Sequence, residues 1–484
     1  MSQKAIKGLK PVLLWQHFYE LSQIPRPSKR EYKAVEFVKQ FAKRNNFQFK
    51  EDKVGNVVIS VPTTKGKEKS PTIVLQGHVD MVCEMNKGTK HDFDKDPIKL
   101  INIGEWIKAD GTTLGADNGI GVAAAMAIAL DNSSVHGPLE LLFTIDEETG
   151  MTGVNELQPK FISGKTLLNM DSEEDGAFYV GCSGGQDTAG SFKINYKKPK
   201  KDFVAYELLI TGLKGGHSGL DIILQRANSI KLLVHFLSQL KIKFQIAQVS
   251  GGSLRNAIPR EAEVVIFIDP KDFSNLKKSA KDFVSKSLLE FKTVDSGLNI
   301  IIKKSKNKFS KVFKNELTEK LINVILALPH GVMAMSPDIP NLVETSTNLA
   351  TLKMDKKIVT IGTSQRSSIE SAKNKIANTV KSVFNLSGAK LTEGDGYPGW
   401  KPNMDSNLLK VSKKVFVEMF NKEPEIKAIH AGLETGLLGA KFPGLDMISF
   451  GPTIQGAHSP DEKVNIKDVE KFYNLLKGIL KELS

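Results

Sequence analysis

The sequence predicts an α/β protein in which an α+β domain interrupts a domain with a largely parallel central sheet. Two observations carry this prediction. Short apolar segments alternate with helix-like segments early in the chain and again near its end, as is typical of a buried parallel sheet. The middle instead shows consecutive strands with hairpin-like joins, which indicate antiparallel sheets backed by helices. We therefore expect a split domain at 1–185 and 390–484, and an inserted domain at 186–389.

The two flanking parts supply the elements of the predicted parallel sheet. A first amphipathic helix begins near Pro11, and an alanine-rich segment predicts a second helix at 119–132. A helix at 407–420 and a closing helix from Ile466 continue the pattern. Apolar, β-rich runs predict strands at 57–62, 72–80, 139–146, 165–171, 425–432 and 445–452.

The inserted part contains two similar groups of helices and strands, without a clear sequence repeat between them. Strands are expected at 203–213, 244–252, 261–269, 298–304, 343–354 and 357–367. Helices are expected at 227–240, 273–291, 314–329 and 368–386.

Composition excludes several classes of protein. The net charge is +13, but the lysine clusters at 197–201 and 303–308 do not interleave with aromatic residues. A solvated lysine-rich surface therefore explains the charge better than nucleic-acid binding. No apolar run reaches the roughly 18 residues of a membrane span. With only Cys83 and Cys182 there is no disulfide framework, so we expect a cytoplasmic location and no membrane partner.

The strand predicted at 72–80 ends in two polar residues, His78 and Asp80. Residues two apart share one face of a strand, so the carboxylate can fix the tautomer of a metal-binding imidazole. Active groups in open α/β sheets collect at such carboxyl ends of strands. A histidine that merely hydrogen-bonds to an aspartate would show the same pattern.

Three more polar residues follow predicted strands or lie in glycine-rich loops. Asp117 precedes a helix between glycine-rich turns, where it is either an N-cap or a group at a closely approached centre. Asp171 ends another apolar strand, and His458 lies in a loop before the last helix.

Glu147 and Glu148 follow Asp146 at the end of a fourth strand. Three adjacent carboxylates repel one another unless a cation is present, although a solvated acidic turn is the alternative. Neighbouring residues of an extended chain face opposite ways, so one glutamate can bind metal while the other handles a proton.

Taken together, these residues predict a hydrolytic metal centre. Nitrogen and oxygen ligands without thiolate suit zinc, manganese or cobalt. Two metals need a bridging carboxylate, for which Asp117 is the candidate.

The segments GHVDMV, LGADNGIG, TIDEETGMTG, LLNMDSEEDG and GAHSPDE resemble the co-catalytic zinc aminoacylase and dipeptidase superfamily in order and spacing. The resemblance spans the whole chain and implies a zinc-peptidase-like catalytic domain, an inserted lid and two divalent metal ions, with zinc the leading candidate. The implied ligands are His78, Asp117, Glu148, Asp171 and His458, with Asp117 bridging. Glu147 would be the general base and Asp80 would orient His78. The peptide after Asp117 is expected to be cis.

The same resemblance implies a set of substrate-binding residues. His217 would stabilise the oxyanion, although a turn histidine would fit its glycine-rich segment equally well. Asn256 and Arg366 would bind the substrate's C-terminal carboxylate and nearby carbonyl, for which a guanidinium fork is suited. His430 and Gly432 would line the pocket.

The subgroup most resembled is the aminoacyl-histidine dipeptidases. It implies hydrolysis of Xaa-His and other dipeptides by a metal-activated water, with Glu434 available for the substrate's amino group. The alternatives are an N-acyl amino acid deacylase or tripeptidase of the same superfamily, or a non-catalytic peptide- or metal-binding protein. Relatives dimerise through the inserted domain, so both a homodimer and a monomer stay open.

Overall fold

The computed structural model describes residues 2–484, which divide into two compact units. Unit 1 consists of the chain up to Gly181, Pro402–Ala428 and Leu433–Ser484. Unit 2 consists of Cys182–Lys401 and the short segment Ile429–Gly432.

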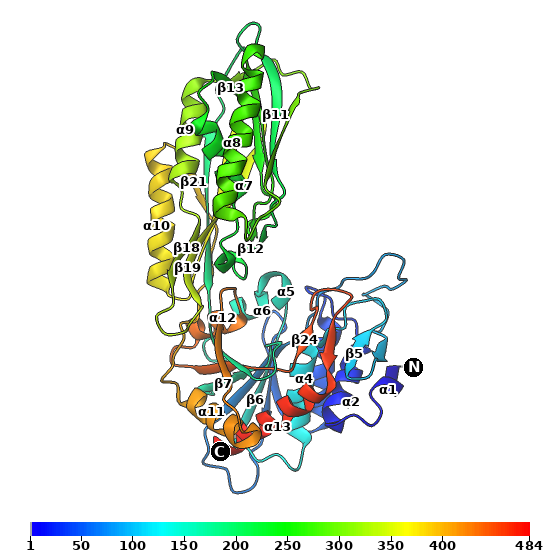
Figure 1. Ribbon diagram of the computed structural model, residues 1–484. Helices are drawn as coiled ribbons and strands as arrows, with labels where there is room; N and C mark the ends of the chain where they lie inside the picture. The colour runs from blue at the N-terminus through cyan, green and yellow to red at the C-terminus, as the bar shows by residue number, and fades with distance from the viewer. Residues whose placement is uncertain (1) are drawn as a thin grey trace. The chain divides into compact units, whose positions relative to one another are not determined.

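Unit 1 is organised around an eight-stranded sheet (Figure 1). Its four central strands, β6, β3, β7 and β23, are parallel, and the flanking pairs β1–β2, β2–β6 and β23–β8 are antiparallel. The predicted fold class is confirmed. In spatial order the strands are β1 Gln48–Glu51, β2 Val57–Val61, β6 Leu139–Thr144, β3 Ile73–His78, β7 Thr166–Asn169, β23 Asp446–Ser449, β8 Ala177–Cys182 and β22 Glu425–Ile429.

Helices cover both faces of this sheet. Gly77 of β3 faces Asn118 and Val122 of α4, whereas the side chain of the preceding residue, Gln76, bonds to Glu434 of α12. Since successive strand residues face opposite ways, α4 and α12 lie on opposite faces. The helices of unit 1 are α1 Ser2–Ala5, α2 Val12–Ser22, α3 Tyr32–Arg44, α4 Ala116–Leu130, α5 Glu147–Gly150, α6 Thr152–Glu156, α11 Asn407–Phe420, α12 Glu434–Lys441 and α13 Ile466–Glu482.

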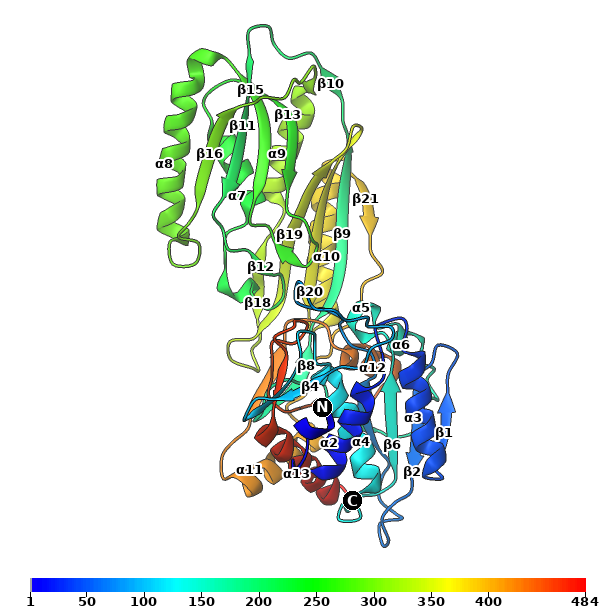
Figure 2. The same ribbon diagram turned by 90° about the vertical axis from the view of Figure 1, so that its right-hand side faces the viewer.

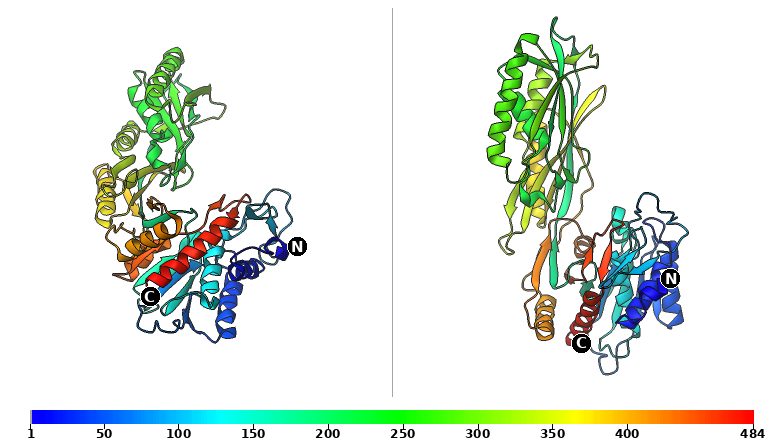
Figure 3. Two further views of the ribbon diagram at one scale, coloured as in Figure 1. Left: turned by 60° about the horizontal axis from the view of Figure 1, so that its bottom comes forward. Right: turned by 45° about the vertical axis from the view of Figure 1, so that its right-hand side comes forward.

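Early and late parts of the chain meet in unit 1. Strand β23 pairs with β7, and the C-terminal helix α13 packs beside α4 (Figure 3, left). A second, four-stranded sheet has the order β24-β25-β5-β4 and also joins both parts of the chain. Its strands are β24 Ile454–Gln455, β25 Lys463–Asn465, β5 Trp106–Ala109 and β4 Leu100–Asn102.

Unit 2 contains one continuous antiparallel sheet of nine strands, so the two predicted groups of helices and strands share a single sheet. Along the sheet the strands are β16 Asn299–Lys304, β11 Val204–Thr211, β15 Ala262–Ile268, β13 Phe244–Gly251, β19 Val343–Met354, β20 Ile358–Ser367, β9 Gly184–Lys193 and β21 Lys390–Glu393, with β18 Gly331–Met335 paired to β19. Two short ribbons pair β10 Tyr196–Lys197 with β17 Val312–Phe313, and β12 Gly216–His217 with β14 Ala257–Ile258.

Four helices pack on one face of this sheet (Figures 2 and 3). They are α7 Ser229–Gln239, α8 Phe273–Phe291, α9 Asn315–Ala327 and α10 Glu370–Leu386. Apolar strand residues such as Val264 and Ile266 share one core with the helices, whereas Val265 and Phe267 face a small cluster on the other side. This alternation follows the two-residue period of the strands.

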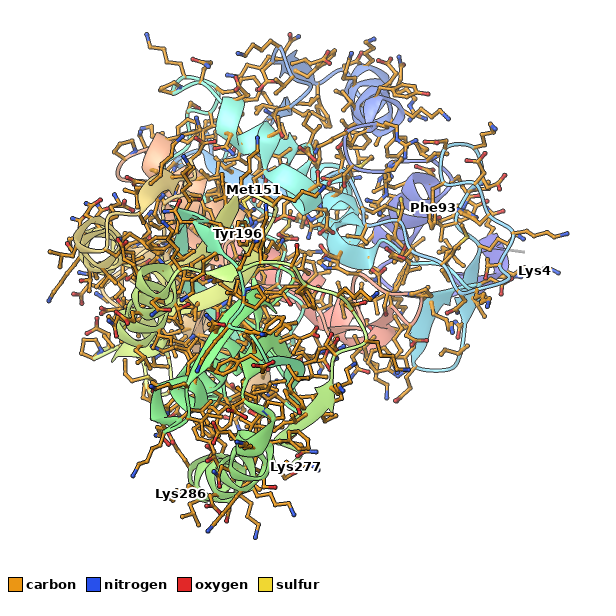
Figure 4. All side chains as sticks on the ribbon, turned by 90° about the horizontal axis from the view of Figure 1, so that it is seen from above. Lys4, Phe93, Met151, Tyr196, Lys277 and Lys286 are labelled. Atoms are coloured by element: carbon orange, nitrogen blue, oxygen red, sulfur yellow. The ribbon has the colours of Figure 1, made fainter. Side chains whose placement is uncertain are left out.

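Lysines lie on the surface, as expected from the net charge. Lys277 and Lys286 stand exposed on α8 (Figure 4). Among residues 2–484, every helix is too short or too polar to cross a bilayer.

Candidate metal centre

Adjacent parallel strands of unit 1 bring the predicted ligands together. Strand β3 ends in His78 and lies between β6, which leads into Glu147 and Glu148, and β7, which leads to Asp171. The carboxyl ends of parallel strands meet at one edge of a sheet, so these side chains converge there.

His78 is completely buried and contacts a carboxylate on each side of its ring. Nε2 lies 3.1 Å from Oδ1 of Asp117 and 3.3 Å from Oδ1 of Asp171. On the other side, Nδ1 lies 3.2 Å from Oδ1 of Asp80. This is the arrangement in which a second carboxylate fixes the tautomer of a metal-binding imidazole.

The second oxygen of Asp117 faces a different imidazole. Oδ2 lies 3.1 Å from Nε2 of His458, and the same nitrogen lies 3.0 Å from Oε2 of Glu148. Asp117 is not the N-cap of α4, because Gly115 holds that position, and the Asp117–Asn118 peptide is cis, as the resemblance implies.

The donor set fits divalent cations. His78, Asp117 and Asp171 offer ligand atoms within 4.8 Å of one another, and so do Asp117, Glu148 and His458. Oε1 of Glu148 is buried without a hydrogen-bond partner among residues 2–484. Buried polar atoms are normally satisfied, so this atom is suited to a ligand that the protein does not supply.

Glu147 lies beside these groups, on a turn that Asp80 holds. The backbone N–H groups of Glu147 and Glu148 donate to the two carboxylate oxygens of Asp80, at 3.1 Å and 3.2 Å. Asp146 adopts a left-handed conformation there, and its N–H donates to Oε1 of Glu31 at 3.0 Å. Asp80 thus contacts His78 and also fixes the turn that carries both glutamates.

In unit 2, the hydrogen bonds of His217 determine its tautomer. The N–H groups of Gly219 and Leu220 donate to Nδ1 of His217, at 3.2 Å and 3.1 Å. A neutral imidazole then carries its hydrogen on Nε2, which is free to donate. Burial lowers the pKa of His217, and the nearby charge of Arg366 lowers it further. His217 is therefore a neutral hydrogen-bond donor at neutral pH.

Arg366 and His430 lie close together in the same unit. Arg366 is opposite Ser346 in the β19–β20 register, and the Ser346 hydroxyl lies 2.7 Å from Nε2 of His430. The Arg366 guanidinium donates to the Tyr397 hydroxyl at 2.8 Å, and its Nε is buried without a partner among residues 2–484. Burial and the charge of Arg366 lower the pKa of His430 to about 3.

The other two predicted substrate residues have less defined surroundings. Asn256 is exposed, and its carbonyl accepts from the N–H of Ser218 at 2.8 Å. A side chain at Gly432 would meet the ring of Tyr397 at 2.9 Å, so glycine is needed for this approach.

Comparison with known proteins identifies the family. The model of the peptidase family M20/M25/M40 matches residues 74–482. The chain belongs to this family. It is 40% identical over 481 residues to a cytosol non-specific dipeptidase of Escherichia coli K12, with 99% of each protein covered.

Similarity to solved structures supports the same family assignment. An aminoacylhistidine dipeptidase from Vibrio alginolyticus matches with a TM-score of 0.92 and 39% identity, covering 99% of each chain. A tripeptidase from Staphylococcus aureus shares the fold at a TM-score of 0.57 and 15% identity, covering 98% of this chain and 99% of the other. The resemblance stated from the sequence is confirmed.

Negative charge is concentrated at the centre of this M20-family chain. Burial raises the pKa of Glu147, and it raises that of Asp171 to about 7, with the surrounding carboxylates adding to both shifts. Asp117 and Glu148 raise the pKa of His458 to about 11. Clustered carboxylates of this kind are relieved by a bound cation.

Beneath the ligands of the M20-family centre lies a polar layer that the sequence pattern did not reveal, apart from Glu434 itself. Gln76 and Thr144 donate to Oε2 of Glu434 at 2.6 Å and 2.8 Å, and Asn169 donates to Gln76 at 2.5 Å. Burial raises the pKa of Glu434 to about 8, and its Oε1 has no partner among residues 2–484. Gln76 and Asn169 lie two residues before His78 and Asp171, and residues two apart share one face of a strand. This spacing is the sequence feature from which the polar layer could have been predicted.

Proposed function

We propose that this chain is a metal-dependent dipeptidase that hydrolyses Xaa-His and other dipeptides. The observation that carries the proposal is Asp117, whose two oxygens lie 3.1 Å from two different imidazoles, those of His78 and His458. The end-to-end similarity to a dipeptidase of Escherichia coli and an aminoacylhistidine dipeptidase of Vibrio alginolyticus supports the substrate class.

Five residues would hold two divalent ions. His78 and Asp171 would serve one ion, Glu148 and His458 the other, and Asp117 both. Zinc is the metal we propose first, and manganese or cobalt suit the same ligands. When bound, such ions lower the pKa of a coordinated water and polarise the scissile carbonyl.

The remaining residues move or hold protons. Glu147 would accept the proton of the attacking water and return it to the leaving amine. Its raised pKa suits a group that both takes and gives a proton. Asp80 would keep His78 in the required tautomer, and Nε2–H of His217 would donate to the carbonyl oxygen as it becomes negative.

The two ends of the substrate would be recognised by opposite charges. Arg366, with Asn256, would bind the C-terminal carboxylate, and His430 and Gly432 would shape the surrounding pocket. Glu434 would accept the N-terminal ammonium group through its unpartnered oxygen. Binding both charged ends would limit the length of the substrate to two residues. For partners we therefore propose small dipeptides, and for location the cytoplasm, which suits the name of the Escherichia coli relative.

One substrate panel tests the proposal. The purified chain is assayed on a carnosine-like dipeptide, a tripeptide and an N-acetyl amino acid, before and after chelation and after zinc, manganese or cobalt is added back. We expect dipeptide hydrolysis that chelation abolishes and metal restores. Preference for the tripeptide or the N-acetyl amino acid would favour the tripeptidase or deacylase alternatives. No hydrolysis of any substrate by the metal-loaded protein would contradict the proposal.

A further inference from the structure

The turn that carries Asp117 is held by a buried carboxylate from a distant part of the chain. Glu462 is 2% exposed. Its Oε2 accepts from the backbone N–H groups of Leu114 and Gly115 at 2.7 Å and 2.9 Å. Its Oε1 accepts from those of Ala116 at 2.8 Å and Asp117 at 3.3 Å. Glu462 thus accepts from four consecutive backbone N–H groups in the turn that leads into α4, including those of the first two helix residues, which a helix leaves unpaired.

A buried cation holds the same turn through its carbonyl groups. Arg26 is 2% exposed, and its guanidinium donates to the carbonyl oxygens of Gly115 at 2.5 Å, Asp80 at 2.8 Å and Val79 at 3.0 Å. Arg26 therefore ties the Asp117 turn to the end of β3, where His78 and Asp80 lie. The negative charges of Glu462 and Asp80 favour its charged form, which burial disfavours.

The glycines of this turn are required by the approach of Arg26. A side chain at Gly115 would meet Nη2 of Arg26 at 2.4 Å, and one at Gly119 would meet it at 2.9 Å. Gly115 also has a φ of 70°, which favours glycine. The LGADNGIG segment is thus shaped to receive a guanidinium on one side and a carboxylate on the other.

Glu462 also connects two of the proposed ligands. It lies in the loop between β24 and β25, four positions after His458. A shift of this loop therefore moves His458 and the Asp117 turn together. Burying a charged side chain is costly, so the placement of Arg26 and Glu462 against the backbone of the Asp117 turn calls for an explanation other than stability.

We infer that Glu462 and Arg26 are positioning residues that hold Asp117 and His458 at the spacing needed to bind two metal ions. The inference rests on the proposed metal centre. Neither side chain belongs to the groups of candidate metal ligands. Both act through the backbone of the segments that carry the ligands.

The test replaces Glu462 by Gln and by Asp. Gln keeps the shape but puts an N–H₂ group against backbone donors, whereas Asp keeps the charge and shortens the reach. The control is Asp461→Asn, which removes an exposed carboxylate from the neighbouring position of the same loop. Zinc affinity is measured by competition with a chromophoric chelator, and the melting temperature is measured with and without zinc.

We expect Glu462→Gln to weaken zinc binding about 10- to 100-fold, the range found when outer partners of metal ligands are lost. The zinc-induced rise in melting temperature should shrink as well. A residue that only stabilises the fold would lower the melting temperatures with and without zinc equally, and would leave zinc affinity unchanged. The Asp461→Asn variant should match the wild type.

Unchanged zinc affinity in the Glu462 variants would overturn the inference. If neither Glu462 variant folds, Arg26→Lys is tested in their place, because lysine keeps the charge but cannot reach the carbonyls of both Gly115 and Val79. We expect Arg26→Lys to weaken zinc binding. Unchanged zinc affinity in this variant would again refute the inference. Dipeptide hydrolysis by the wild type tests the proposed function separately. Weaker zinc binding in the variants of an inactive wild type would therefore support this inference while the proposed function fails.

Discussion

Nε2 of His458 lies 3.1 Å from Oδ2 of Asp117, although the two residues are 341 positions apart in the chain. The contact forms because β23 and β24 bring the late segment back beside the early strands of unit 1. The site therefore depends on long-range folding, and its proposed roles lead to separable experiments.

Replacing Glu147 by Gln should abolish proton transfer without removing a proposed ligand. We expect kcat to fall about 10²- to 10⁴-fold, the usual contribution of a general base, with KM and metal content little changed. Steady-state kinetics and metal analysis measure both. The matched control is Glu156→Gln, a glutamate of α6 that pairs with Lys53 at the surface. Full activity in Glu147→Gln would remove Glu147 as the base.

Replacing Arg366 by Met should weaken binding of the substrate's C-terminal carboxylate. Hydrogen bonds to charged groups contribute about 1.5–3 kcal/mol, so KM should rise about 10- to 100-fold. The control is Arg255→Met, an arginine 81% exposed that pairs with Asp187. A dipeptide amide, which lacks the carboxylate, should be cleaved poorly by the wild type and no worse by Arg366→Met. A further loss on the amide would indicate that Arg366 acts elsewhere.

Replacing Glu434 by Gln should separate substrates by their amino termini. Gln keeps the shape and can still contact Gln76 and Thr144, but it cannot give up a proton to become the carboxylate that we propose for the ammonium group, whose positive charge would favour the deprotonated form of Glu434. KM for dipeptides should rise about 10-fold, in the range of a lost charged hydrogen bond. KM for any N-acetyl substrate that is cleaved should stay the same. An equal effect on both substrates would contradict ammonium recognition.

Replacing Asp131 by Asn should weaken the contact between α4 and α13 more at neutral pH than near pH 2. Burial opposes the charge of Asp131, but Lys477 at 2.8 Å and the Ser133 hydroxyl outweigh it and lower the pKa of the carboxyl. A lowered pKa adds stability above the unfolded-state value of about 3.9 and loses it as the pH falls through the folded value. We expect Asp131→Asn to cost about 1 kcal/mol at pH 7. Urea unfolding should show a smaller difference near pH 2, and an equal difference at both pH values would contradict this origin.

The sequence predicted those features that depend on local pattern. Strands β3, β6 and β7 are apolar runs followed by polar residues. The apolar run and the polar residues after it are both visible in the sequence. The histidine and carboxylates at these ends were therefore identifiable before their distances were known.

Features that depend on distant neighbours could not be predicted in the same way. Strand β9 is rich in glycine and polar residues, which suggest a loop. Yet a side chain at Gly190 would meet the ring of Phe384 at 2.2 Å, so α10 requires glycine there. Arg26 and Glu462 bond to backbone groups, which leave no trace in residue types, and their partners lie up to 348 positions away.

The pairing of β7 with β23 has a consequence for biosynthesis. During translation, the apolar edge of β7 has no partner until Asp446–Ser449 leaves the ribosome, and His458 and Glu462 emerge later still. All of unit 2 has left the ribosome by then, because its last segment, Ile429–Gly432, precedes Asp446 in the chain. A nascent chain stalled before β23 would therefore contain all of unit 2 but an incomplete unit 1. It would depend on chaperones until β23 pairs with β7 and completes the sheet.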